Sequence, residues 1–340
     1  MALARSSVWP GALVVIVALV GGVLFAFAQG RYAVSVTDLA RVAWARLTAQ
    51  PSGLPLNVET VVWQIRGPRV LAAFAVGAAL SVAGTAFQGL FRNPLVSPDI
   101  LGASAGAALG AVLGIYFSLG IFGIQAAAFV GGLAAVALVY ALGSTLRAGD
   151  PVLMLLLTGI VVGSLLGAGI GLVKYLADPY NQLPAMTFWL LGSLAGVSAR
   201  DIEPLALPVL AGTGVLLALR WKLNVMSLPD EEARSLGAST HWLRVTIVAA
   251  ATLVTAASVA VAGVVGWVGL VVPHLARLLV GPSFPRLLPT AAVLGGALLL
   301  FIDTVARTLA AVEIPLGILT AVVGTPFFIV LLRSAHQRAA

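Results

Sequence analysis

The stretch PRVLAAFAVGAALSVAGTAFQGL, residues 68–90, decides the class of this protein because it carries only one charged side chain, Arg69. A helix of this length crosses the roughly 30 Å hydrocarbon core of a bilayer. Similar runs recur along the 340-residue chain, which is 60% hydrophobic and 9% charged. Soluble domains are about half apolar and about a quarter charged. The sequence therefore predicts an all-α polytopic membrane protein.

We predict about ten membrane-spanning helices within a single transmembrane domain that takes in residues 1–340. The predicted helices are 10–29, 68–90, 99–117, 121–145, 151–177, 203–221, 243–262, 264–280, 286–308 and 313–333. The first follows Arg5 and has Ala26-Phe27-Ala28 near its end, as a cleaved signal peptide would. Its apolar part of about 20 residues exceeds the roughly 7–15 of a signal peptide, which favours a retained helix.

Two polar segments interrupt the apolar runs. Residues 30–66 form the first, in which Thr37 is the predicted N-cap of an amphipathic helix. One face of that helix carries Leu39, Val42, Ala43 and Leu47. A helix of this kind lies flat on a membrane interface. The second segment, residues 224–240, reads NVMSLPDEEARSLGAST.

The second segment has the signals of a short helix. We predict that it begins at Ser227 or Leu228, with Pro229 in its first turn and three consecutive acids, 230–232, at the positive end of its dipole. Gly237 is a natural stop. A helix of about two to three turns does not persist alone in water, and this one is too polar for lipid. It must therefore dock on its own bundle or on a soluble cytoplasmic partner.

Arginine predicts the topology. An even helix count puts both termini on one side, and the arginines near that side make it cytoplasmic by the positive-inside rule. Several basic residues fall outside instead: Arg31, Arg41, Arg46, Arg66, Arg69, Lys174, Arg200 and Arg307. The net charge of +7 indicates topology and contact with membrane lipid rather than nucleic-acid binding. The excess of basic residues on the outer side of the membrane favours a partner with acidic residues.

Arg66 and Arg69 flank Pro68 at the start of the second predicted helix. Two cations at the positive end of a helix dipole are unfavourable, so an acidic partner is the better explanation. Contact with lipid phosphate is the alternative. Near the outer end of the ninth helix, Asp303 and Arg307 are spaced i,i+4, and we predict that they neutralise each other.

Glycine recurs every four residues in two predicted helices. The third has Gly102, Gly106, Gly110 and Gly114, and the fifth has Gly159, Gly163, Gly167 and Gly171. This spacing aligns the glycines on one helix face, where a second backbone can approach closely. Tight helix packing is the simpler interpretation, and lining of a translocation pathway is the more specific one.

The sequence has no recognisable catalytic motif. Cysteine is absent, neither lysine follows a glycine as in a P-loop, and the three histidines are scattered. The G-x-S-x-G match at residues 102–106 lies inside a glycine ladder and lacks the strand–turn–helix context of a nucleophile elbow. We therefore expect no catalytic, cofactor-binding or metal-binding residue and no enzyme activity in this chain.

Five segments together resemble the FecCD-type permease family. They are RGPRVLAAFAVGAALSVAGTAFQGLFRNPLVSPDILGASAGA, FWLLGSLAG, LNVMSLPDEEARSLGA, GLVVPHLAR and EIPLGILTAVVGTPFFIVLL, in this order between about residues 60 and 333. Members of this family, which include the vitamin B12 and haem importer permeases, are membrane subunits of type II ATP-binding-cassette (ABC) importers. The resemblance implies the type II permease fold and a homodimer in the bacterial inner membrane. It also implies two cytoplasmic ATPase subunits, which bind ATP and Mg, and a periplasmic substrate-binding protein.

The resemblance also implies roles for particular residues. The coupling helix that fits the ATPase corresponds to Leu228, Pro229, Asp230, Glu231, Glu232, Ala233, Arg234, Leu236 and Gly237. Which of these side chains make the contact stays open: if the acids mainly cap the helix, Leu228, Ala233 and Leu236 are left to dock. The arginines that receive acidic residues of the binding protein correspond to Arg66, Arg69 and Arg307.

Two further sites follow from the same resemblance. The family's cytoplasmic gates fall at Asn93, Pro94, Leu95 and Val96, and at Gly149, Asp150 and Pro151. The fifth helix, with Gly159, Gly163, Gly167 and Gly171, lines the translocation pathway at the dimer axis.

The substrate stays open at this level. NPLVSPDILG and GSLAG look most like the iron-chelate branch, which predicts an iron-siderophore or haem. Cobalamin importers and importers of oxyanions such as molybdate share the scaffold. The alternative from another class is an ion-coupled secondary transporter, and a membrane enzyme is a third reading with no catalytic constellation to support it.

Overall fold

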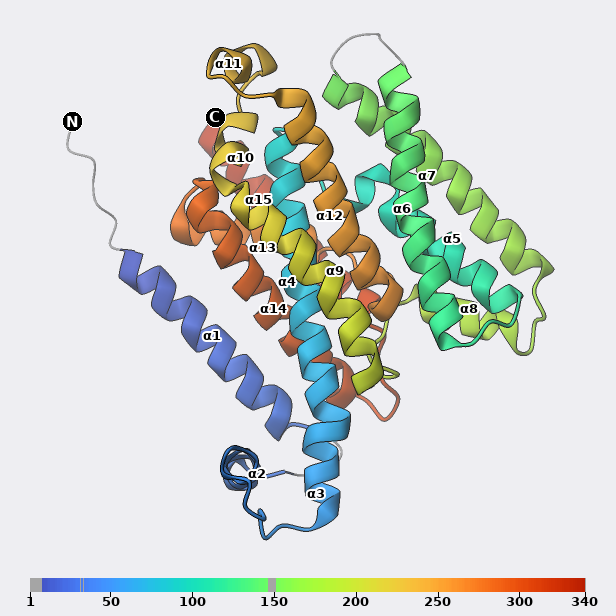
Figure 1. Ribbon diagram of the computed structural model, residues 1–340, viewed down its shortest axis with the longest axis vertical. Coiled ribbons are helices and arrows are strands. Elements are labelled where there is room, and N and C mark those ends of the chain that lie inside the picture. Colours follow the sequence, from blue (N-terminus) through green and yellow to red (C-terminus); the bar gives the residue numbers. More distant parts are fainter. Residues whose placement is uncertain (1–7, 31, 33, 146–150, 340) are drawn as a thin grey trace.

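The computed structural model describes residues 8–30, 32, 34–145 and 151–339. Every regular element within these residues is a helix, and the long helices lie side by side in one bundle (Figure 1). The short helix α11 (Asp230–Ser235) lies at one end of the bundle, and α2 (Val36–Thr48) and α3 (Leu56–Thr60) lie at the other (Figure 1). We name these the α11 end and the α2 end.

Each of the ten predicted spans contains a helix. These helices are α1 (Val8–Ala28), α4 (Gly67–Leu90), α5 (Ala103–Tyr116), α6 (Ile121–Thr145), α7 (Pro151–Leu176), α9 (Ala199–Ala218), α12 (Thr240–Ala262), α13 (Val268–Val280), α14 (Phe284–Thr308) and α15 (Leu316–Ala339). Among the described residues, 6 helices are long and apolar enough to cross a membrane, and the one that contains α4 begins at Leu56. Four shorter apolar helices, in α1, α5, α13 and α15, complete the set.

Short elements connect the long ones. They are the π-helical turn η1 (Val61–Arg66), which joins α3 to α4, the 3₁₀ turn η2 (Pro98–Leu101), α8 (Gln182–Leu190) and α10 (Arg220–Met226).

Helix α4 forms the centre of the bundle and contacts α14, α12, α13 and α9. Glycines make two of these contacts close. A Cβ at Gly77 would overlap the carbonyl oxygen of Gly295 in α14, and a Cβ at Gly84 would overlap that of Gly269 in α13. Membrane helices gain stability from such close backbone approach, because burial of apolar surface gives little advantage in lipid.

We expect Gly84→Ala to lower the stability of the protein by about 1–3 kcal/mol, because the added methyl group overpacks a backbone contact that cannot yield. The midpoint of thermal unfolding in detergent measures this. Gly214→Ala in α9 is the matched control, since nothing lies within 4 Å of the methyl group it adds. Equal midpoints for the two variants would contradict the close-packing explanation.

The glycine ladder of α5 is a packing surface, as its simpler interpretation predicted. Added Cβ atoms at Gly106 and Gly110 would meet the backbone of α6 at Gly131 and Ala127, and one at Gly114 would meet Ile124. The packed ladder begins at Gly106, four residues later than predicted, because Gly102 caps η2 with a left-handed φ of 80° and does not face α6.

The amphipathic helix α2 differs from its prediction in two ways. Its N-cap is Ser35 and not Thr37, because the Ser35 hydroxyl accepts from Asp38 N at 3.1 Å while Ser35 N donates to the Asp38 carboxylate at 3.3 Å. The predicted apolar face is also divided. Val42 is buried, whereas Leu47 is 83% exposed. Val42 packs in a cluster with Val34, Val58 and Val62, so the helix buries one side against its own chain.

Candidate functional site

The α11 segment is shorter than its prediction and begins later. Pro229 is its N-cap rather than part of its first turn, and the helix has only 6 residues, Asp230–Ser235. It ends as predicted at Gly237, whose φ is 80°. Gly237 N donates to Arg234 O at 2.9 Å, and Ala238 N donates to Ala233 O at 3.0 Å. This pair of bonds is a Schellman motif, which requires the left-handed conformation that glycine adopts freely.

Two contacts hold the segment on its own bundle. Asp230 accepts a hydrogen bond from Arg244 of α12 at 2.7 Å, and the Arg244 side chain is only 7% exposed. Ala233 is 1% exposed. The expectation that Ala233 docks on a partner is therefore wrong, because the smallest side chain of α11 lets the helix approach its own chain closely. Leu236 stays outside at 65% exposed.

The outward face of the segment is acidic and apolar together. Pro229, Glu231, Glu232, Arg234 and Leu236 are exposed, and Leu228 is half-buried. Arg234 lies 3.8 Å from Asp230 and is 63% exposed, so this ion pair is weak.

The first predicted gate is a turn after α4, near the α11 end (Figure 1). Asn93 Oδ1 accepts from Leu95 N at 2.9 Å, and Val96 N donates to Asn93 O at 3.3 Å. Asn93, Pro94 and Leu95 are exposed, whereas Val96 is buried in the main apolar cluster. The turn is thus fixed at Val96 and presents its other three residues outward.

The second predicted gate is described only in part. Gly149 and Asp150 lie outside the described residues, and Pro151 is exposed at the first position of α7.

Helix α7 lies at the edge of the bundle and leaves much of its apolar surface uncovered (Figure 1). Only one of its four predicted pathway glycines packs closely, since a Cβ at Gly159 would overlap the carbonyl oxygen of Ile100 in η2. Nothing in the described chain lies within 4 Å of a Cβ at Gly163, Gly167 or Gly171. The helix surface at these three glycines is therefore not packed against any described part of the chain.

The three predicted docking arginines gather at the α2 end, around a cavity of about 570 Å³ that Tyr32 and Glu313 also line. Each has partners within the chain. Arg66, 4% exposed, donates to the carbonyl oxygens of Phe27 and Tyr32.

Arg69 is the centre of this charge cluster. Its guanidinium donates to Asp303 at 2.7 and 3.0 Å and to Glu313 at 2.6 and 3.1 Å. Arg307 lies farther from Asp303, at 3.6 Å, and donates to the carbonyl oxygen of Ala26. The predicted Asp303–Arg307 pair is therefore secondary, because packing of α14 on α4 brings Asp303 to Arg69 in a bidentate pair.

The cluster is unequal in charge, since it holds three arginines and two carboxylates, and Arg66 contacts neither carboxylate. Sequence reasoning missed Glu313, the acid between α14 and α15 that binds Arg69. Its oxygen Oε1 also accepts a hydrogen bond from Ser193 at 3.3 Å. The only sequence signal for a role of Glu313 was that acidic residues are rare in this apolar chain.

The family model of the FecCD transport family matches residues 13–334. The chain therefore belongs to the FecCD transport family. It is a membrane permease of an ABC importer, with the type II importer fold.

Three relatives and one solved structure are similar over most of their length. The molybdate import system permease protein MolB of Haemophilus influenzae is 38% identical, over 89% of each chain. The cobalamin import system permease protein BtuC of Halobacterium salinarum is 42% identical, over 84% of this chain and 77% of its own. The hemin transport system permease protein HmuU of Yersinia pestis is 41% identical, over 82% and 85%. A metal-chelate type ABC transporter in an inward-facing conformation aligns with a TM-score of 0.85 at 35% identity, over 95% of this chain and 98% of its own.

Proposed function

We propose that this permease moves a metal chelate, an iron-siderophore or haem, from the periplasm to the cytoplasm, driven by ATP hydrolysis in a separate subunit. The observation that carries the proposal is the likeness to the metal-chelate type transporter over 95% of the chain. The hemin permease relative supports the same class. The second candidate is cobalamin or an oxyanion such as molybdate, favoured by the relatives named for those substrates.

The proposed assembly has two copies of this chain in the bacterial inner membrane, two cytoplasmic ATPase subunits and a periplasmic binding protein. The outward face of the α11 segment supports contact with the ATPase at a cytoplasmic α11 end, where both termini would also lie. The open glycine stripe of α7 supports a pathway at the axis of the dimer. The arginine-lined cavity supports docking of an acidic side chain of the binding protein at the opposite end.

Uptake into proteoliposomes that contain the permease, its ATPase and its binding protein tests this function. Iron-hydroxamate, hemin, cyanocobalamin and molybdate are offered one at a time with internal or external ATP. ATP-dependent uptake of one of the two iron compounds is the expected result. Uptake of cyanocobalamin or molybdate alone would select the second candidate. Uptake driven by an ion gradient without the ATPase would indicate a secondary transporter.

We expect Glu313→Gln to tighten docking of the binding protein, because it frees Arg69 of one carboxylate and raises the positive charge of the cavity. The gain should be larger at low salt, where screening between the two proteins is weaker. Titration of the labelled binding protein against the permease at two salt concentrations measures it. Glu203→Gln, an exposed acid in the first turns of α9, controls for net charge. Unchanged affinity would favour the alternative, contact of these arginines with lipid phosphate.

A further inference from the structure

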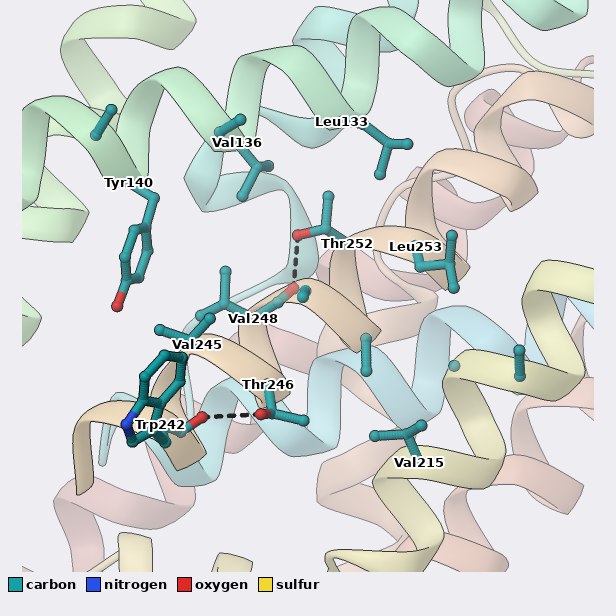
Figure 2. A pocket seen from close by; sticks show the side chains of 16 residues that line it. Leu133, Val136, Tyr140, Val215, Trp242, Val245, Thr246, Val248, Thr252 and Leu253 are labelled. Atoms are coloured by element: carbon teal, nitrogen blue, oxygen red, sulfur yellow. Dashed lines mark hydrogen bonds between the residues drawn. The ribbon is translucent and has the colours of Figure 1, made fainter. Parts of the chain in front are cut away.

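An apolar groove of about 840 Å³ lies on the outside of the bundle between α6, α9 and α12. Figure 2 shows its walls, with Leu133 and Val136 on one side, Val215 on another and the residues of α12 from Trp242 to Leu253 between them. The two threonines in the wall donate their hydroxyl groups to their own helix, Thr246 to Trp242 O at 2.8 Å and Thr252 to Val248 O at 2.7 Å. The groove therefore presents an apolar surface to whatever occupies it.

The groove is about one leaflet long. Trp242 and Leu253 mark its two ends along α12, and at 1.5 Å per residue they are about 16 Å apart. The hydrocarbon core of a bilayer is roughly 30 Å thick, so one leaflet is about half of that. A partner helix that crosses the membrane would contact the bundle over both leaflets, whereas the lining residues stop near the middle.

The end of the groove nearest the α11 end is aromatic. Tyr140 and Trp242 lie together there, whereas Leu133 and Leu253 lie toward the other end (Figure 2). Trp242 is 69% exposed, and within the described residues neither the Tyr140 hydroxyl nor the Trp242 indole nitrogen makes a hydrogen bond. Tyrosine and tryptophan gather at the headgroup level of membranes, where the ring is in hydrocarbon and the polar atom meets the headgroup.

Basic side chains lie on α10, at the same end of the bundle as α11 (Figure 1). Helix α9 continues almost directly into α10, where Arg220 and Lys222 are exposed and Trp221 is 67% exposed. Arg220 follows the lining residue Val215 of α9 by five residues in the sequence. Cations at this level attract phosphate groups of the membrane surface.

We propose that this groove binds one glycerophospholipid, with an acyl chain along α12 and the phosphate beside Tyr140 and Trp242, at the end of the bundle where the basic residues of α10 also lie. The lipid comes from the leaflet at the α11 end. Only the naming of that leaflet as cytoplasmic rests on the proposed function. The site adjoins the anchor of the α11 segment, because Arg244 follows Trp242 by two residues on α12.

Photo-crosslinking tests the site. The complete permease is reconstituted in vesicles of phosphatidylethanolamine and phosphatidylglycerol that contain a trace of phosphatidylglycerol with a diazirine in one acyl chain. Crosslinked peptides are then identified by mass spectrometry. With the diazirine near the ester, we expect labelling around Trp242. With the diazirine near the terminal methyl, we expect labelling around Leu133 and Leu253.

Two filling variants act from opposite walls, Ala249→Trp on α12 and Ala137→Trp on α6. Each is expected to reduce labelling of the groove by about tenfold or more, the change that 1.4 kcal/mol of lost affinity produces. Ala134→Trp is the matched control on α6, since Ala134 is exposed but does not line the groove.

Two results would overturn the proposal: even labelling of all exposed apolar residues, or undiminished labelling in both filling variants. The readout is independent of transport. Labelling at the expected depths in a permease that moves no chelate would retain the lipid site and remove the proposed function.

Discussion

Arg244→Ala is expected to abolish ATP-driven uptake and ATPase co-purification while the helix bundle stays folded. The Arg244 side chain is 7% exposed and lies 2.7 Å from Asp230, so it is the main polar anchor of the α11 segment. A hydrogen bond between charged groups contributes about 1.5–3 kcal/mol. Its loss lowers the ratio of docked to undocked segment by about tenfold to a hundredfold. A helix of 6 residues has no stability of its own to compensate.

The control for this variant is Arg234→Ala, which removes the other cation near Asp230. Because that pair is 3.8 Å apart and Arg234 is 63% exposed, we expect a change in uptake of less than about twofold. The charge-swapped double variant Asp230→Arg with Arg244→Asp should recover part of the ATPase association. Full co-purification by Arg244→Ala alone would show that the segment does not need this anchor.

Asp303→Ala is expected to lower the stability of the permease by about 3–5 kcal/mol, because it leaves buried cations without their counter-charge. Asp303 is 1% exposed and binds Arg69 through both oxygens, and Arg69 and Arg307 are each 11% exposed. After the substitution, Arg69 keeps only Glu313 as a partner and Arg307 loses its ion pair. The yield of folded protein and the midpoint of thermal unfolding in detergent measure the loss.

A paired substitution separates the charge effect from loss of packing. Replacing a buried ion pair by apolar residues of similar volume is often neutral in proteins. Arg69→Met with Asp303→Leu should therefore restore much of the stability that Asp303→Ala loses, although Glu313 then lacks its partner. Wild-type stability of the single variant Asp303→Ala would mean that water already reaches the cluster.

Local sequence patterns were enough to predict much of the fold. The apolar runs predicted the ten helices because a segment without charges that is long enough to cross the bilayer has few alternatives to a helix in lipid. The stop of α11 at Gly237 was equally local, since a left-handed residue after a polar turn is the usual end of a helix. The N-cap of α2 was assigned to Thr37 instead of Ser35, because two adjacent hydroxyl residues satisfy the same rule and only the bond to Asp38 distinguishes them.

Features that depend on residues close in the sequence can be predicted from the sequence, whereas contacts between distant residues need the tertiary structure. By itself the sequence determined the membrane class, the positions of the helices and the presence of a short acidic segment, because these depend on neighbours within a few turns. Only the tertiary structure decided which charges pair. Arg69 and Asp303 are 234 positions apart and meet through the packing of α4 on α14. Likewise, Ala233 faces inward because Arg244 of another helix holds Asp230, and no local pattern encodes that contact.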